Sequence, residues 1–463
     1  MSRTSIPAYN EQHPIEFASE ESTSAQSVAM PGEIPWTLPP QKQYVFRNAS
    51  LVDPANGQVH PNTTVTTRGG KIVHVEKSST ADDHGIDLKG KYLSPGLIDC
   101  HVHLNAVPGE KGLYAMKHLD QNVITLRATQ MAKDMIKRGF TSARDCGGTS
   151  VAMKEAIQQG VVNGPRLFVG LNQLTQTGGH GDLRDRFDLT ECCGGHIFGS
   201  GRLCDGPAEC LRVSRDQIRR GADFIKIMGG GGVSSPTDAI DSVQFNAEEI
   251  RTMSEVASIN KTYVSCHAYT PQSIQNAIMN GVRAIEHGNL MDEPTAQLMV
   301  EKKCFLTPTL ITYEAMASDR YVSYLPVEGV EKNASVLRAG LGSLKLADDA
   351  GITMCFGTDL LGPMCHLQTH EFSIRSQVLS AEKVLKMATV NAAQLLMRES
   401  MLGKIEEGYA ADLLVLNANP LEDVTILDHP EKHLLLVMKE GRVHVSRWSM
   451  VPVEVDPPEG NIE

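Results

Sequence analysis

Short apolar runs alternate with amphipathic helical patterns through the middle of the chain. We interpret eight of these runs as buried strands: Gly96–His103, Thr141–Cys146, Arg166–Leu171, Phe224–Met228, Tyr263–His267, Ala284–His287, Phe305–Thr309 and Thr353–Thr358. Strands that alternate with helices predict an α/β fold, in which eight βα units close into a (β/α)8 TIM barrel. A doubly wound open sheet is the alternative, although no glycine fingerprint follows the first run.

The helices between these runs carry recognisable start and stop signals. Asn246, with Glu249 three residues later, predicts a capping box at the start of a helix. Thr270 precedes a proline that opens the next helix, and Gly281 closes it. Ser380 is predicted to cap a further helix. These signals support the assignment of helices between the strands.

Both ends of the chain show a different pattern of short, partly alternating strands. Before the first barrel strand these are Tyr44–Phe46, Thr64–Thr67 and Gly70–Glu76; after Leu396 they are Asp412–Leu416, His433–Met438 and Arg442–Val445. We expect the two sets to form one small β-sandwich. The predicted organisation is a disordered or extended arm over 1–42, sandwich parts at 43–95 and 397–447, the barrel at 96–396 and a tail at 448–463.

Composition and charge narrow the classes of function. Among 463 residues, 41% are hydrophobic and 21% are charged, which is typical of a globular protein. The formal net charge of −12 argues against a nucleic-acid partner, which would need a basic face. No run of about 20 apolar residues exists, so no segment is expected to span a membrane.

The first residues and the cysteines indicate the compartment. Met1–Ala29 is polar and lacks the apolar core of a secretory signal. Several of the 10 cysteines lie in apolar, strand-like runs, which suits reduced thiols. We therefore expect a cytoplasmic protein, and a homo-oligomer. A disulfide or a second metal site stays open for one glycine-rich segment that holds Cys192, Cys193, Cys204 and Cys210.

A His-x-His pair ends the first predicted barrel strand. Side chains of a strand alternate between its faces, so His101 and His103 point the same way. Two imidazoles on one face can chelate zinc or a similar divalent ion. Taken alone, the pair is equally compatible with two surface histidines.

Other predicted strands also end in side chains that bind or bridge metals. Lys226 interrupts an apolar run, and burying an ammonium group without a partner is strongly unfavourable. The carboxyl ends of barrel strands meet on one face, so we expect these side chains to surround one metal site. The candidate ligands are His101, His103, Lys226, His267, His287 and Asp359.

In this combination of residues the chain resembles the amidohydrolase superfamily. The resemblance rests on Pro95–His103, Lys226, His267, His287, Gly357–Asp359 and a return segment from Gly403 to Leu421, and it covers residues 43 to 447. It implies two divalent metals, usually zinc, bridged by a hydroxide and by Lys226 as its carbamate. Carried over residue by residue, His101, His103 and Asp359 bind the first metal, and His267 and His287 bind the second.

General chemistry agrees with what the resemblance implies. A lysine on a dry strand is easily neutral, and a neutral amine adds carbon dioxide to give a carbamate. Two metals about 3.5–4 Å apart lower the pKa of a shared water, so that hydroxide exists near neutral pH. Asp359 would take the proton of that water and pass it to a leaving amine.

Within the superfamily, the chain is similar to the branch of prolidase-like dipeptidases, imidazolonepropionase-like proteins and ochratoxinase. Its signs are Gln176–Asp182, Lys226–Met228, Asp238 and Gln244-Phe245. His180 is expected to point into the site and contact a carbonyl or carboxylate of the substrate. The alternative is a loop histidine that stabilises a glycine-rich turn.

Two further positions complete the expectations for the site. Tyr269 replaces a second histidine that many members carry, and we expect it to act with His180 and Asp359 as a catalytic or substrate-binding residue. Arg144 and Asp145 are expected to form a structural ion pair.

The predicted function is a binuclear metal-dependent amidohydrolase. Its expected substrates are small molecules, dipeptides or N-acyl amino acids, which the metal-bridging hydroxide attacks. A lactonase or cyclic-amide hydrolase that uses the same site is the alternative within enzymes. A non-catalytic scaffold that kept the barrel is the alternative of another class, and metal analysis of the purified protein separates it from an enzyme.

Overall fold

The computed structural model describes residues 34, 36–38, 40–78, 84–109, 112, 119–182, 184, 186–187, 200–235 and 237–457. The chain divides into two units, Met1–Thr37 and Leu38–Glu463. Most of the predicted arm, Cys192 and Cys193, and the end of the predicted tail lie outside the described residues. The eight cysteines within the described ranges are all free thiols, Cys204 and Cys210 included.

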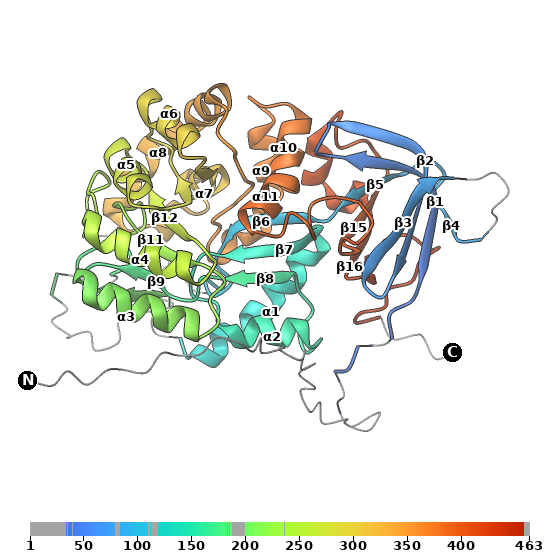
Figure 1. Ribbon diagram of the computed structural model, residues 1–463, viewed down its shortest axis with the longest axis horizontal. Coiled ribbons are helices and arrows are strands. Elements are labelled where there is room, and N and C mark those ends of the chain that lie inside the picture. Colours follow the sequence, from blue (N-terminus) through green and yellow to red (C-terminus); the bar gives the residue numbers. More distant parts are fainter. Residues whose placement is uncertain are drawn as a thin grey trace, which may run out of the picture. The chain divides into compact units, whose positions relative to one another are not determined.

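One mixed sheet joins strands from both ends of the chain. Its path is β17-β16-β15-β5-β1-β2-β3, and β4 pairs with β1. In Figure 1 the blue strands of the first part lie beside the red strands of the last part, where β5 pairs antiparallel with β15. The strands are β1 Tyr44–Asp53, β2 Gln58–Arg68, β3 Lys71–Lys77, β4 Ile86–Asp87, β5 Tyr92–Pro95, β15 Leu413–Leu416, β16 Leu434–Lys439 and β17 Arg442–Ser446.

Two parallel sheets lie between these ends in sequence. The first has the order β6-β7-β8, with β6 Leu97–Val102, β7 Phe140–Asp145 and β8 Arg166–Val169. The second has the order β10-β9-β11-β12-β13-β14. Its strands are β9 Gln173–Thr175, β10 Gly201–Leu203, β11 Ile225–Met228, β12 Val264–Ala268, β13 Ala284–His287 and β14 Phe305–Thr307.

Three of the eight predicted strands differ from the structure by two or more residues at one end, and one of them is the seventh, Phe305–Thr309, which ends at Thr307 as β14. The third ends at Val169 because Leu171 has a left-handed backbone (φ 57°), and the chain resumes as β9. The eighth, Thr353–Thr358, makes only an isolated bridge from Met354. It still hydrogen-bonds on both sides: Cys355 N donates to Leu306 O (2.8 Å), and Cys100 N donates to Phe356 O (2.8 Å). This segment therefore connects β14 to β6 without forming a regular ladder.

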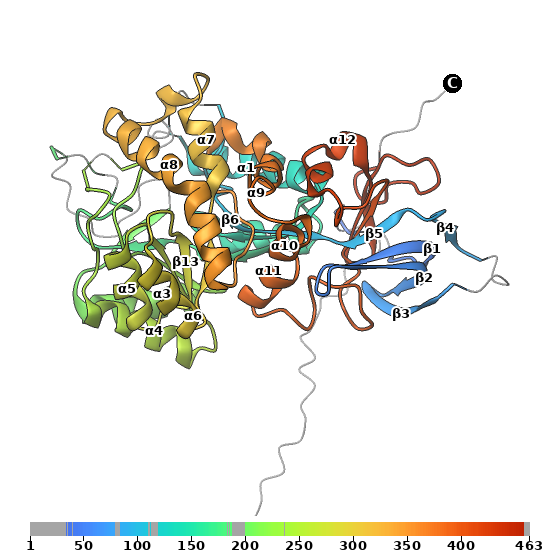
Figure 2. The same ribbon diagram turned by 90° about the horizontal axis from the view of Figure 1, so that it is seen from above.

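Helices follow most of the parallel strands. Figure 2 shows α3 to α6 close together. Each of these helices packs against the next along the chain; α3 contacts β11, and α4 and α5 contact β12. The α-helices are α1 Gln121–Lys137, α2 Val151–Gln158, α3 Gly206–Arg219, α4 Ala247–Ile259, α5 Pro271–Met279, α6 Glu293–Glu301, α7 Leu310–Ala317, α8 Val327–Ala350, α9 His370–Arg375, α10 Ala381–Met387, α11 Val390–Leu395 and α12 Pro430–His433. Short 3-10 helices are η2 Val322–Tyr324, η3 Gly362–Leu367 and η4 Val424–Asp428.

The predicted helix caps are confirmed. Asn246 and Glu249 form a complete capping box at the start of α4. Thr270 occupies the N-cap of α5 before its proline, and the Ser380 hydroxyl accepts from Lys383 N at the start of α10. None of the helices in the described ranges is both long enough and apolar enough to cross a membrane.

The hydrophobic core follows the sheets. One large buried cluster lies between the parallel strands and their helices, and a second covers the mixed sheet. A third includes Ile98, Phe224, Tyr263 and Phe305, which lie at or next to the amino ends of parallel strands. The apolar packing thus leaves the carboxyl ends of these strands to polar side chains.

Candidate active site

A pocket with a volume of about 110 Å³ lies at the carboxyl ends of β6, β11, β12 and β13. All eight residues that the sequence nominated for the site line it: His101, His103, His180, Lys226, His267, Tyr269, His287 and Asp359. Tyr313, Met228, Val233 and Met316 add to the wall. The strands therefore bring together the side chains that sequence reasoning selected.

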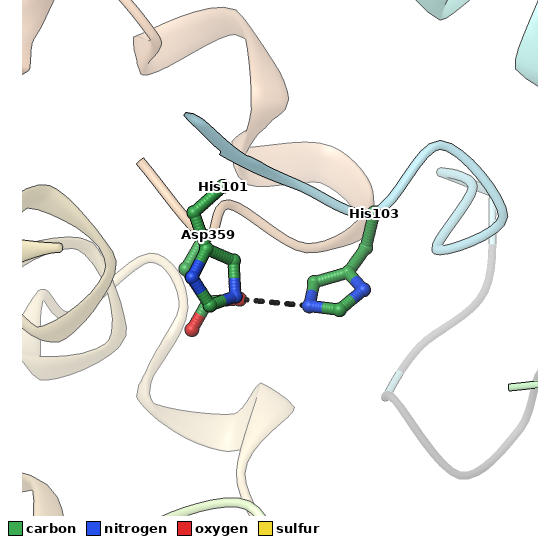
Figure 3. Close-up of side chains that lie close together, drawn as sticks. All are labelled: His101, His103 and Asp359. Atoms are coloured by element: carbon green, nitrogen blue, oxygen red, sulfur yellow. Dashed lines mark ion pairs between the residues drawn. The ribbon is translucent and has the colours of Figure 1, made fainter. Parts of the chain in front are cut away.

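His101, His103 and Asp359 form the tightest group in this pocket. Asp359 Oδ1 lies 3.4 Å from His101 Nε2 and 3.2 Å from His103 Nε2. Figure 3 shows a nitrogen of the His103 ring pointing at the Asp359 carboxylate. The three residues satisfy the geometry of a metal-binding group.

The other ring nitrogen of each histidine is fixed by a hydrogen bond. His101 Nδ1–H donates to Glu286 Oε2 (2.8 Å), and His103 Nδ1–H donates to Gly147 O (2.9 Å). A neutral imidazole that is protonated at Nδ1 offers a lone pair at Nε2. Both lone pairs then face the same carboxylate oxygen, which a cation between them would stabilise.

Burial and nearby charge set the protonation of this group. Burial lowers the pKa of His101 to about 4, although Asp359 and Glu286 oppose the shift. Burial alone would raise the pKa of Asp359, but His101 and His103 outweigh it and lower the pKa. Burial alone would lower the pKa of His103, but Asp359 and Asp145 outweigh it and raise the pKa. Near neutral pH His101 is therefore neutral and Asp359 is ionised, which are the forms that bind a metal.

His267 and His287 follow the same arrangement on the neighbouring strands. His267 Nε2–H donates to Gly231 O (3.1 Å), which leaves a lone pair on Nδ1. His287 Nδ1 lies 2.8 Å from Thr309 Oγ1 and 2.9 Å from Tyr313 OH, and either hydroxyl can accept from it, so Nε2 keeps a lone pair when Nδ1 carries the proton. The ring centroids of His267 and His287 are 4.6 Å apart. Burial lowers the pKa of both rings well below the usual value, so both rings are neutral near neutral pH.

Lys226 is the residue whose environment calls for a further partner. Its side chain is 1% exposed on β11, and its Nζ has no hydrogen-bond partner within the described part of the chain. A buried amine without a partner is costly. Together with four imidazole lone pairs and a carboxylate, this orphaned nitrogen fits a site completed by metals and by a carboxylated lysine.

His180 lies in the site rather than supporting a turn at a distance. Its ring stacks on His267 with a centroid distance of 4.3 Å. His180 Nδ1–H donates to Ser235 Oγ (2.7 Å), and the Ser235 hydroxyl donates to Asp238. Gln244 Oε1 accepts from His180 N (2.8 Å), and its amide donates to Asp238 (2.9 Å). These contacts hold the ring from one side and leave Nε2 toward the pocket.

Tyr269 follows β12 directly and is 2% exposed. Its ring stacks on His287 with a centroid distance of 5.1 Å, and its hydroxyl lies 2.9 Å from Tyr313 OH. Burial raises the pKa of both tyrosines, so both are neutral. Tyr269 is therefore a rigid, uncharged polar group at the wall of the pocket.

The predicted Arg144–Asp145 ion pair is wrong. Arg144 NH2 instead pairs with Glu286 Oε1 at 2.6 Å, and both side chains are fully buried. Asp145 accepts from Leu104 N (2.8 Å) and from the Thr149 hydroxyl (2.6 Å). Adjacent residues of a strand point to opposite faces, and this alternation separates the two side chains.

Glu286 and Tyr313 are site residues that sequence reasoning missed. Glu286 precedes His287 on a fully buried strand and orients His101. A carboxylate in a buried apolar strand needs a charged partner, and this signal was available in the sequence. Tyr313 lies on α7, where no pattern distinguishes it from a core tyrosine.

Comparison with known proteins agrees with this geometry. The profile of the amidohydrolase family matches residues 92–444. Ochratoxinase from Aspergillus niger is 31% identical over 387 residues, which cover 79% of this chain and 77% of that protein. The match therefore spans most of both proteins.

Solved structures show the same relationship. A prolidase in complex with N-methylphosphonate-L-proline is 39% identical, with a TM-score of 0.83, and the match covers 88% of this chain and 100% of that one. A Xaa-Pro dipeptidase with methionine bound in its active site is 28% identical, with a TM-score of 0.77, over 87% of this chain and 99% of that one. These matches confirm the predicted superfamily. The chain therefore belongs to the amidohydrolase family, and it is a hydrolase of amide or peptide bonds.

Proposed function

We propose that this chain is a binuclear metal-dependent amidohydrolase that cleaves dipeptides or N-acyl amino acids. We further propose that its parallel strands close into a (β/α)8 barrel over 96–396, with a small β-sandwich from 43–95 and 397–447. The hydrogen bonds of Cys355 and Phe356 to β14 and β6 support closure. A cytoplasmic homo-oligomer remains part of the proposal.

One observation carries the metal site. The buried Lys226 amine lacks a partner among the described residues, in a pocket where four imidazoles each keep one nitrogen tethered and one lone pair available. His101, His103 and Asp359 would hold the first metal, and His267 and His287 the second. Lys226, carboxylated by carbon dioxide, would bridge both. Divalent ions at such a site would supply a nucleophilic water near neutral pH, and imidazole and carboxylate ligands suit zinc.

Asp359 is the proposed proton carrier. It is ionised, it is held by its backbone N–H to His101 O (2.8 Å), and its side chain lines the pocket. It would accept a proton from the attacking water and return it to the nitrogen of the leaving amine. His180 and Tyr269 would contact the substrate from the opposite wall.

The names of the relatives support a small amide substrate. An ochratoxinase, a prolidase and a Xaa-Pro dipeptidase all match over most of this chain. The wall of the pocket that carries Met228, Val233 and Met316 suits an apolar group on the substrate. We therefore place the acyl or side-chain portion of the substrate against these residues.

A hydrolysis screen tests the proposal. The purified chain, supplied with zinc and bicarbonate, is assayed against a library of dipeptides and N-acyl amino acids. Release of free amino acid by the wild type, and its loss in Lys226→Ala, is the expected result. Hydrolysis of lactones or cyclic amides alone would redirect the proposal to those substrates, and no hydrolysis by a metal-loaded protein would overturn it.

A further inference from the structure

Three buried side chains that line the pocket, His287, Tyr313 and Tyr269, form a continuous hydrogen-bonded chain. Tyr313 OH lies 2.9 Å from His287 Nδ1 and 2.9 Å from Tyr269 OH. The two tyrosines are 1% and 2% exposed, so water does not compete for these hydrogen bonds. Tyr313 itself belongs to α7 and has no part in the ligand set described above.

The direction of this chain depends on which nitrogen of His287 carries its proton. A His287 that offers Nε2 to a cation keeps its one proton on Nδ1, where it must donate. Its two acceptors are Thr309 Oγ1 at 2.8 Å and Tyr313 OH at 2.9 Å. Because a protonated Nδ1 has no lone pair, the Tyr313 hydroxyl cannot donate to it, and the Tyr313 hydrogen has to point elsewhere.

Distance selects the next acceptor. Tyr313 OH lies 2.9 Å from Tyr269 OH and 3.3 Å from Thr309 Oγ1, so the Tyr313 hydrogen favours Tyr269. The Tyr269 oxygen then accepts, and its own hydrogen is left to point into the pocket that the residue lines. One ligand tautomer thus fixes the orientation of two hydroxyl groups.

We propose that a cation on His287 fixes a one-way chain from His287 through Tyr313 to Tyr269, which makes the Tyr269 hydroxyl a hydrogen-bond donor to the substrate. The group that it meets is an oxygen of a carboxylate or carbonyl. Tyr313 is a positioning residue in this chain. The inference rests on the proposed function, because it needs His287 to bind the metal through Nε2.

The composition of the pocket makes the Tyr269 hydroxyl important for binding an oxygen of the substrate. The described lining contains no arginine, and its one lysine is Lys226, which the metal site occupies. A carboxylate or carbonyl oxygen therefore meets neutral donors here rather than a salt bridge. Because a neutral donor binds both kinds of oxygen, a substrate pair that differs only in the carboxylate tells the two apart.

The test is a double-mutant cycle of Tyr313→Phe and Tyr269→Phe in the zinc-loaded protein. The substrates are an N-acyl amino acid and the matching N-acyl alkylamine without the carboxylate. Each single variant should raise KM for the acid by about three- to tenfold, the usual effect of one hydrogen bond, with little change in kcat. In the Tyr269→Phe background, Tyr313→Phe should add almost nothing. Additive effects would overturn the chain.

Zinc affinity gives a readout that does not depend on turnover. Competition with a chelator should show weaker zinc binding in Tyr313→Phe, because the Nδ1–H of His287 loses one acceptor, and unchanged binding in Tyr269→Phe. Equal weakening in both variants, or none in either, would contradict the proposed direction. Wild-type protein that binds no zinc and hydrolyses no substrate would instead refute the proposed function.

If Tyr313→Phe does not fold, Tyr269→Phe assayed with the two substrates still tests the donor role of Tyr269. Tyr269→Phe alone should reduce the preference for the acid over the alkylamine if the donor meets the carboxylate. It should raise KM equally for both substrates if the donor meets the carbonyl. An unchanged KM for both would refute a donor role for Tyr269.

Discussion

The Glu286 carboxylate contacts both the metal-binding group and a buried arginine: it accepts from His101 Nδ1 (2.8 Å) and pairs with Arg144 (2.6 Å). We predict that Glu286→Gln weakens zinc binding about 10–100-fold, the usual effect of losing a carboxylate that orients a ligand histidine. The variant should also be less stable, since breaking a buried ion pair costs about 3–5 kcal/mol. A zinc competition assay and a thermal melt measure the two effects.

Glu371→Gln is the matched control for this experiment. Glu371 is equally buried and pairs with Arg375 at 2.7 Å, away from the pocket. The Glu371→Gln variant should lower the melting temperature as Glu286→Gln does and leave zinc affinity unchanged. Equal loss of zinc in both variants would show that Glu286 acts only through general stability.

Lys226→Ala should lose metal and activity, because Lys226 would supply the bridging oxygens. Short carboxylic acids such as acetate or propionate should restore part of the activity, since they offer the same oxygens. Lys439→Met serves as the control: Lys439 is also buried, but its Nζ donates to Gly164 O (2.8 Å). Full activity of Lys226→Ala would show that this lysine is a core residue.

The purified protein should contain about two divalent metals per chain. Five protein side chains and a bridging lysine exceed the four ligands of a single tetrahedral zinc. Elemental analysis after purification in zinc-supplemented buffer gives the ratio. A ratio that saturates at one metal per chain would mean that only one of the two proposed sites binds a metal. Single variants in the His267–His287 site and in the site of His101, His103 and Asp359 would show which one it is.

Asp359→Asn should keep the fold and lose turnover by about 10²–10⁴-fold, the usual contribution of a general acid–base group. Asp359 has a left-handed backbone (φ 51°), which asparagine tolerates well. The amide can still offer an oxygen to a metal but cannot accept a proton at neutral pH. Kinetics at saturating zinc check this, and near-normal turnover there would assign Asp359 to metal binding alone.

His370 should make stability depend on pH. Burial alone would lower its pKa, but Asp428 (2.8 Å) and Glu314 (3.4 Å) outweigh burial and raise it. A raised folded-state pKa gives stability that is complete below the unfolded value of about 6.5 and fades as pH rises through the folded value. His370→Gln should therefore lower the melting temperature more at pH 5.5 than at pH 8.5. An equal loss at both values would contradict this prediction.

The sequence predicted the elements that have a clear period or cap. Asn246 and Ser380 mark helix starts because side-chain caps act locally, and Thr270 marks one because a proline follows it at the first helical position. The eight nominated residues share one pocket because parallel strands align their carboxyl ends. These predictions are confirmed because a helix start depends on nearby residues and because parallel strands end on the same side of a sheet.

The misses have physical causes that a local pattern does not contain. The break at Leu171 follows from one left-handed residue inside an apolar run. The partner of Arg144 comes from a strand far along the chain, so adjacency to Asp145 was misleading. Tyr313 reaches the site because α7 begins shortly after β14, and its hydroxyl lies 2.9 Å from His287 Nδ1. Side-chain pairing across elements has to be read from three-dimensional structure.

The pairing of β5 with β15 has a consequence for how the chain is made. During synthesis β5 emerges early, whereas its partner emerges only near the end. Until then one edge of a largely buried strand stays bare, and bare edges are templates for aggregation. A chain truncated before Leu413 would therefore contain every proposed metal ligand but would expose the unpaired edge of β5, which would promote aggregation.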